Sequence, residues 1–96
     1  MKYRYRAAEA FWKSFCALRP EQKESVRAAW LLFKEDPFHP RLRTHKIHRL
    51  SSALNRTVHA VVIEGDLRFV FYIDGGTVFT FGIGSHDIYK PQRGHL

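Results

Sequence analysis

The sequence predicts a two-layer α+β domain in which an N-terminal strand and a helical hairpin pack on an antiparallel β-sheet. Apolar residues recur at helical spacing between residues 8 and 33, with one proline break. Alternating apolar runs then follow between residues 57 and 83, separated by short turns that contain glycine and aspartate. With 96 residues, eight Phe, two Trp and four Tyr, the chain can build one hydrophobic core. We therefore expect residues 1–96 to form a single domain.

The first strand and the helical hairpin account for the first 36 residues. Lys2–Arg6 alternates basic residues with tyrosines, a pattern typical of a strand at a sheet edge. Pro20 suits the first position of the second helix, and Asp36-Pro37 ends that helix. Cys16 is the only cysteine, which excludes an intrachain disulfide and fits a reducing cytosol. Its position in the amphipathic pattern predicts a core or boundary residue.

Four strands are predicted after the hairpin. The phenylalanine-rich side of the last three, including Phe79 and Phe81, is expected to hold the helices. The opposite side is expected to stay open and polar. The predicted strands are 44–50, 57–64, 67–73 and 77–83, with a polar connection at 51–56 and turns at Gly65-Asp66 and Asp74-Gly75-Gly76.

The chain carries a formal net charge of +7, which points to a polyanionic partner such as nucleic acid or an acidic protein segment. Much of this charge is concentrated between residues 36 and 56, where five basic residues face one acidic residue and three histidines are interleaved. This segment suits a phosphate backbone. An edge strand protected by charge, or a basic surface that only favours solubility, are the alternatives. The basic residues are Arg41, Arg43, Lys46, Arg49 and Arg56.

Metal and membrane sites are not expected. His45 and His48 are three positions apart, which on a strand directs them to opposite faces, so they do not share an ion easily. We expect no metal and no cofactor. No signal peptide is recognisable, and the longest apolar run, Ala28–Phe33, is too short to cross a bilayer. A cytoplasmic location without membrane contact is therefore expected.

The segment Gly82–Lys90 is the first candidate for chemistry. An apolar strand ends there, and four polar functional side chains follow closely, namely His86, Asp87, Tyr89 and Lys90. An imidazole suits general acid or base catalysis at neutral pH. Tyr89 offers a ring for stacking on a base or a phenol for proton transfer. Asp87 either orients the imidazole or begins a turn.

Arg68 is the second candidate, because it lies in the middle of a predicted apolar strand. A guanidinium in that position must meet an anion or open solvent. On the helix-free side of the sheet it could hold a phosphate through two parallel hydrogen bonds. The spacing leaves open an alternative in which Asp66, Glu64 or Asp87 forms a structural ion pair with it.

Five short motifs follow one another along the chain, and with the order of elements they resemble the RelE/ParE superfamily of bacterial type II toxin–antitoxin toxins. The resemblance runs from about Tyr3 to Lys90. The motifs are Phe11-Trp12-Lys13-Ser14-Phe15 with Leu18, Asp36-Pro37-Phe38-His39-Pro40, His45-Lys46 with Arg49-Leu50, Asp66-Leu67-Arg68 leading to Tyr72, and Ile83-Gly84-Ser85-His86-Asp87-Ile88-Tyr89-Lys90.

This resemblance implies a metal-independent endoribonuclease that cuts mRNA on the ribosome (an mRNA interferase). A ribose 2′-OH would attack the adjacent phosphate and leave a 2′,3′-cyclic phosphate and a 5′-OH. Arg68 would stabilise the charge on the pentacovalent phosphate. We expect His86 to be the general acid, His45 or Lys46 to assist the 2′-OH, and Tyr89 to be the terminal aromatic residue of the site.

The resemblance also implies partners and leaves alternatives open. Arg43, Arg49 and Lys90 are the expected contacts to the RNA substrate. A cognate antitoxin with an acidic or amphipathic segment would form a heteromeric complex, and the free toxin would be monomeric. Members of the ParE branch inhibit DNA gyrase and cut no RNA, and a third possibility is a degenerate member that only binds RNA or its antitoxin. The set of His86, Tyr89 and Arg68 favours the nuclease.

Overall fold

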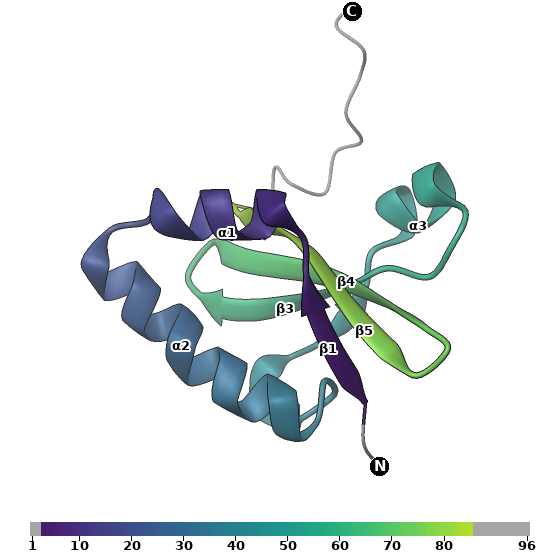
Figure 1. Cartoon of the computed structure of the whole chain (residues 1–96), viewed down its shortest axis with the longest axis horizontal. Coiled ribbons are helices and arrows are strands. Elements are labelled where there is room, and N and C mark those ends of the chain that lie inside the picture. Colours follow the sequence, from purple (N-terminus) through teal and green to yellow (C-terminus); the bar gives the residue numbers. More distant parts are fainter. Residues whose placement is uncertain (1–2, 86–96) are drawn as a thin grey trace, which may run out of the picture.

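The structure is a computed structural model, and it describes residues 3–85. Within these residues three α-helices and one 3-10 helix accompany a five-stranded sheet (Figure 1). The expected α+β class, with a helical hairpin on a sheet, is confirmed. The elements are β1 (Arg4–Ala7), α1 (Glu9–Cys16), α2 (Pro20–Glu35), η1 (Pro40–Leu42), β2 (His45–Lys46), α3 (His48–Leu54), β3 (His59–Glu64), β4 (Leu67–Asp74) and β5 (Thr77–Gly84).

The strands follow the order β1-β5-β4-β3-β2 across the sheet. Neighbours from β5 to β2 are antiparallel, but β1 runs parallel to β5, with Arg4 opposite Thr77, so the sheet is mixed. β1 lies at one edge, as predicted. The Tyr5 hydroxyl donates a hydrogen bond of 2.9 Å to the Phe33 carbonyl of α2, while Arg4 and Arg6 are exposed.

The main core lies between the α1–α2 hairpin and the side of the sheet that we call the first face. Pro20 begins α2 as predicted, and Asp36 is its C-cap. Phe33 is fully buried, and its ring lies 4.9 Å from the rings of both Phe69 and Phe71, measured between centroids. Edge-to-face packing of this kind stabilises aromatic cores. The helical hairpin is therefore fixed on β4.

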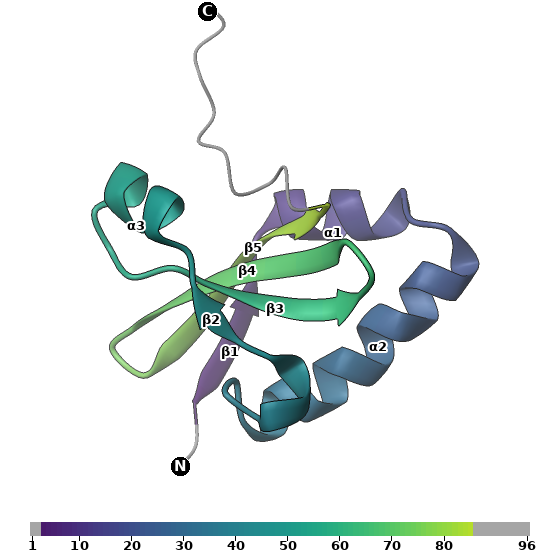
Figure 2. The same ribbon diagram turned by 180° about the vertical axis from the view of Figure 1, so that it is seen from behind.

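The second face of the sheet differs from the prediction, because helix α3 packs on it (Figure 2). The predicted strand over residues 44–50 is wrong beyond His45–Lys46: the chain leaves the sheet after two residues and turns into α3. Leu50 of α3 is 5% exposed and packs with Ile47 against Val58, Ala60 and Val70. The expectation of an open, polar face is therefore wrong for this part of the sheet.

A β-bulge decides which way the aromatic residues of β5 point. Val70 pairs with Gly82 and Phe71 pairs with Thr80, so Phe81 has no partner on β4. Phe81 packs with the second-face cluster, and Phe79 lies opposite Tyr72 on the same face. Their predicted place under the helices is wrong, because the extra residue shifts the alternation of β5.

Cys16 is the last residue of α1. Cys16 is exposed, so its predicted core or boundary position is wrong. It lies five residues after the buried Phe11, a rotation of about 140° around the helix, which turns it away from the sheet.

Among the described residues, no helix combines the length and apolar character that a membrane span requires.

Candidate functional site

Arg68 lies near the start of β4, between Val62 of β3 and Gly84 of β5. Its Nη1 donates hydrogen bonds to the carbonyls of Gly65, at 2.7 Å, and Leu67, at 3.1 Å. These bonds hold the half-buried guanidinium at the β3–β4 turn. The ion pairs found within residues 3–85 do not join Arg68 to Glu64, and Asp87, another partner proposed for Arg68, lies outside the described residues.

The pairing of β2 with β3 places the side chains of His45 and Lys46 on opposite faces of the sheet. His45 pairs with Ala60, which pairs with Val70 of the second face. Because alternate residues point to opposite sides of a sheet, His45 and Arg68 share the second face and Lys46 is directed to the first. Two strand spacings and a two-residue offset place the Cα atoms of His45 and Arg68 about 12 Å apart.

The imidazole of His45 forms a hydrogen bond with the backbone. Its Nδ1 lies 2.9 Å from the Arg43 carbonyl oxygen, which can only accept, so Nδ1 is the donor. The neutral imidazole then has its basic lone pair on Nε2. Arg43 itself has a positive φ of 50°, in the left-handed region, which ends η1 and directs the chain into β2.

The basic residues line the sheet edge opposite β1. These residues are exposed from η1, through β2, to the first turn of α3. Figure 2 shows β2 at this edge, with α3 following it. Exposed cations in a row can bind a phosphate backbone without fixing a base sequence. The exposed cations are Arg41, Arg43, Lys46 and Arg49, and the exposed side chains of His45 and His48 lie among them.

Comparison with known proteins identifies the architecture. No protein-family model and no curated protein matches the sequence. Among solved structures, a chain of the archaeal RelE–RelB complex from Pyrococcus horikoshii matches with a TM-score of 0.66 and 13% identity, covering 100% of both chains. The fold is RelE-like. A copper-bound mutant toxin from Helicobacter pylori matches with a TM-score of 0.60 and 16% identity, covering 90% of this chain and 97% of that chain.

The RelE-like fold confirms the architecture expected from the sequence motifs. Three residues of the predicted site, His86, Tyr89 and Lys90, lie outside the described residues, as does Asp87. Their roles stay predictions. The described part of the site consists of Arg68, His45 and the basic edge. In residues 3–85, no three His, Cys, Asp or Glu side chains are grouped so that they could hold a metal ion.

The second face of this RelE-like sheet also carries the aromatic rings of Phe79 and Phe81, which were predicted for the first face, beside the ring of Tyr72. The Tyr72 and Phe79 rings stack at 5.2 Å between centroids, and Phe81 lies 5.7 Å from Tyr72. All three are half-buried. The Arg56 guanidinium lies 4.3 Å from the Tyr72 ring centroid, and Arg6 lines the adjoining hollow of about 500 Å³. Rings and guanidinium groups are the surfaces on which unstacked bases pack.

His59 is a further residue that the sequence analysis missed. It pairs with Phe71, stacks on that ring at 5.4 Å between centroids, and leaves its buried Nδ1 without a hydrogen-bond partner. Burial lowers its pKa below 6.5, and the neighbouring charges of Lys46 and His45 lower it further. The spacing of His59, Val61 and Ile63 could have revealed it, since the three share one face of β3. We regard it as a residue of the first-face packing.

Proposed function

We propose that this protein is the toxin of a type II toxin–antitoxin pair and acts as a ribosome-dependent endoribonuclease that cleaves mRNA without a metal ion. The RelE-like fold supports the toxin class, because both similar structures carry proteins described as RelE or as a toxin. The observation that carries the nuclease proposal is the common face of Arg68 and His45. A guanidinium that could bind an anion and an imidazole that could accept a proton would then share one face beside the basic edge.

The proposed reaction is attack of a ribose 2′-OH on the adjacent phosphate. His45 Nε2 would take the proton of the 2′-OH, since its Nδ1 is held by the Arg43 carbonyl. Arg68 would stabilise the negative charge on the phosphoryl oxygens with the donors that Gly65 and Leu67 do not use. His86, two positions after the strand partner of Arg68, would protonate the leaving 5′ oxygen. The products are a 2′,3′-cyclic phosphate and a 5′-OH.

Substrate binding would rely on phosphate contacts and stacking. Arg43, Arg49 and Lys90 are the proposed phosphate contacts, with Lys46 contributing charge from the other side of the same edge. Tyr89 would stack on a base. Affinity for RNA or ribosomes should fall steeply with added salt, because bound cations release counterions from the phosphate backbone. Binding that ignores ionic strength would count against the basic edge as the contact surface.

The catalytic assignment is tested on purified ribosomes with a short message. His86→Ala and His45→Ala should each slow cleavage by about 10²–10⁴-fold, as expected for general acid–base residues. Arg68→Ala should slow it by about 10²–10³-fold. Arg4→Ala, which removes an exposed arginine from the opposite sheet edge, is the matched control and should cleave at the parent rate. If His86→Ala cleaves as fast as the parent, the general-acid assignment fails.

Mapping of RNA 5′ ends during arrested growth distinguishes the remaining classes. Arrest with codon-phased ends supports the nuclease. DNA damage signalling without RNA cuts would support a gyrase inhibitor, and neither effect would support a non-catalytic binding protein. The toxin proposal also includes a cognate antitoxin as partner, a heteromeric complex with it, a monomeric free toxin and a cytoplasmic location, where ribosomes are found.

A further inference from the structure

The hollow on the second face takes no part in the proposed chemistry. It has a volume of about 500 Å³, and three aromatic side chains of β4 and β5 line it together with Arg6 of β1. Arg68 and Tyr72 are four positions apart on β4, which separates their Cα atoms by about 13 Å. Helix α3 packs on Val70, which lies between them. The hollow is therefore separate from the candidate site.

A row of side chains crosses the sheet at this hollow. Phe79 of β5 pairs with Arg6 on one side and with Tyr72 of β4 on the other, so the three side chains are neighbours on the second face. The Phe79 and Tyr72 rings stack, with 27° between their planes. Arg56, three positions before β3, continues the row from the β3 side, with its guanidinium 4.3 Å from the Tyr72 ring centroid. Two stacked rings thus lie between two arginines.

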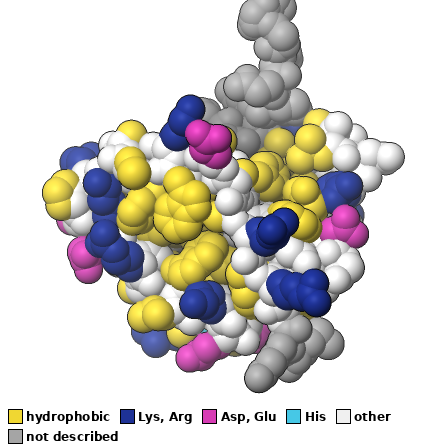
Figure 3. All heavy atoms as spheres, viewed as in Figure 1, with side chains coloured by type: hydrophobic (Ala, Val, Ile, Leu, Met, Phe, Trp, Pro, Cys, Tyr) yellow, Lys and Arg dark blue, Asp and Glu magenta, His cyan; other side chains and the backbone are white. Residues whose placement is uncertain are grey.

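The hollow combines apolar surface with positive charge. Arg6 is exposed, and none of the described residues that line the hollow carries a carboxylate. Asp74 forms an ion pair of 3.8 Å with Arg56, and both of these side chains keep contact with solvent. Figure 3 shows apolar side chains to the right of its centre, with basic side chains next to them. An occupant of the hollow would therefore meet ring faces and guanidinium groups together.

We propose that this hollow binds an unpaired base of single-stranded RNA at a distance from the cut. The base would pack against Phe79 and extend the row of stacked rings, while Arg6 and Arg56 would contact phosphates of the strand. Such a site accepts any sequence, because every base has a face that can stack. The inference deepens the proposed function by naming a second contact for the RNA substrate. It rests on that function only for the choice of RNA as the nucleic acid.

Charge and base pairing disfavour other occupants. In a symmetric dimer the hollow would bring Arg6 and Arg56 toward the same residues of a chain with net charge +7. Residues 86–96 carry one lysine and one arginine against one aspartate, so they are not acidic. In duplex RNA the bases already stack on one another and cannot pack on a protein ring. A single strand offers both the phosphates and the free bases.

Binding is measured without ribosomes, by the fluorescence anisotropy of a labelled RNA of about 10 nucleotides, a length that single-strand sites commonly cover. Methyl groups on its 2′ oxygens remove the attacking hydroxyl, so cleavage cannot disturb the measurement. The same RNA annealed to its complement is the matched ligand, since it keeps the phosphates and hides the bases. The protein should bind the single strand more tightly than the duplex. Both affinities should fall with added salt, because the basic edge contributes to each.

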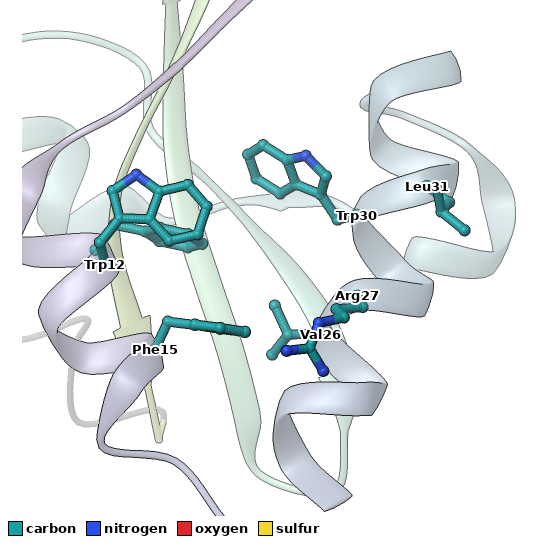
Figure 4. Close-up of a pocket in the computed structure, with 7 residues that line it drawn as sticks. Trp12, Phe15, Val26, Arg27, Trp30 and Leu31 are labelled. Atoms are coloured by element: carbon teal, nitrogen blue, oxygen red, sulfur yellow. The ribbon is translucent and has the colours of Figure 1, made fainter. Parts of the chain in front are cut away.

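A ring substitution tests the location. Phe79→Leu should weaken binding of the single strand about tenfold and leave binding of the duplex unchanged, because a stacking surface is lost and the charge is kept. Phe15→Leu is the matched control. Phe15 is also half-buried and has a guanidinium, that of Arg27, 5.5 Å from its ring centroid, but it lies in the groove between α1 and α2 (Figure 4). This variant should bind both ligands as the parent does.

A charge substitution tests the same site without changing the core. Arg6 is exposed, so Arg6→Ala should keep the parent fold and decides the question if Phe79→Leu does not fold. Its affinity for the single strand should fall about threefold or more and depend less steeply on salt, because one phosphate contact is lost. Arg4→Ala is the matched control, since Arg4 lies on the same strand but pairs with Thr77 instead of Phe79. It should bind the single strand as the parent does.

Several results would overturn the proposal. These are equal binding of single strand and duplex by the parent, equal effects of Phe79→Leu and Phe15→Leu, or parent-like binding by Arg6→Ala. Tighter binding of a polyglutamate peptide than of the RNA, with the same loss in Arg6→Ala, would assign the hollow to an acidic protein segment instead. Loss of cleavage in the ribosome assay with intact single-strand binding would refute the nuclease alone. Loss of the single-strand preference with intact cleavage would refute this binding site alone, so the two proposals fail separately.

Discussion

The side chain of Ser51 holds α3 on the sheet, and its removal has a cost that can be worked out. Its Oγ donates a hydrogen bond to the Ile47 carbonyl at 2.8 Å and accepts one from the Val58 N–H, also at 2.8 Å. Val58 is fully buried. In Ser51→Ala this N–H loses its partner, a penalty of about 1–3 kcal/mol. For a domain of this size that lowers the melting temperature by roughly 10 °C.

The experiment compares thermal and urea unfolding of the parent, Ser51→Ala and Ser52→Ala. Ser52 is the exposed neighbour on α3, so its variant gains the same helix propensity from alanine without losing the hydrogen bond to Val58. We expect Ser51→Ala alone to be destabilised. A loss below about 0.5 kcal/mol, or an equal loss in Ser52→Ala, would refute the reasoning, because the buried N–H would then have found another partner.

Three further predictions concern the core, a turn and pH. Phe33→Ala should cost about 3–5 kcal/mol in urea unfolding, and a cost below 1.5 kcal/mol would contradict the aromatic packing described for it. Gly76→Ala should cost about 1–2 kcal/mol, because φ at Gly76 is 81°, and unchanged stability would show that the turn adapts. The lowered pKa of His59 means that the unfolded chain binds its proton more readily, so stability should fall as the pH drops below 6.5. The difference between the urea-unfolding midpoints above and below pH 6.5 should be smaller for His59→Phe than for the parent protein. An equal decrease in the parent and in the variant would exclude His59 as the cause.

The elements that the sequence could predict are those with strong periodicity. The helical hairpin, the turns and β4 follow from regular apolar spacing and from Pro20. Helix α3 could not be predicted in this way, because Leu50 is the only one of its seven residues that is buried. Its stability comes from tertiary contacts, namely Leu50 on the sheet and the hydrogen bonds of Ser51. The β-bulge at Phe81 likewise depends on the pairing of β5 with β4, which the alternation of apolar residues along β5 does not predict.

In the candidate site, too, some residues could be predicted from the sequence and others only from the structure. Arg68 could be chosen from the sequence because a guanidinium in an apolar strand is costly without an anion or water. The sequence could not choose between His45 and Lys46, which are adjacent. Only the pairing of His45 with Ala60 shows which of the two shares a face with Arg68. Register depends on partners distant in the chain, so no local pattern supplies it.

The parallel pairing of β1 with β5 has a consequence for the order of events during synthesis. Arg4 pairs with Thr77, so β1 can join the sheet only after residues 73 positions further along the chain have been synthesised. Phe11 likewise shares its core cluster with Val78 and Ile83 of β5. Contacts between such distant segments slow folding, because a long loop must close first. The helical hairpin has no finished sheet to pack on while the chain is still being made. For the proposed nuclease, this delays formation of the active fold on the ribosome that is translating it.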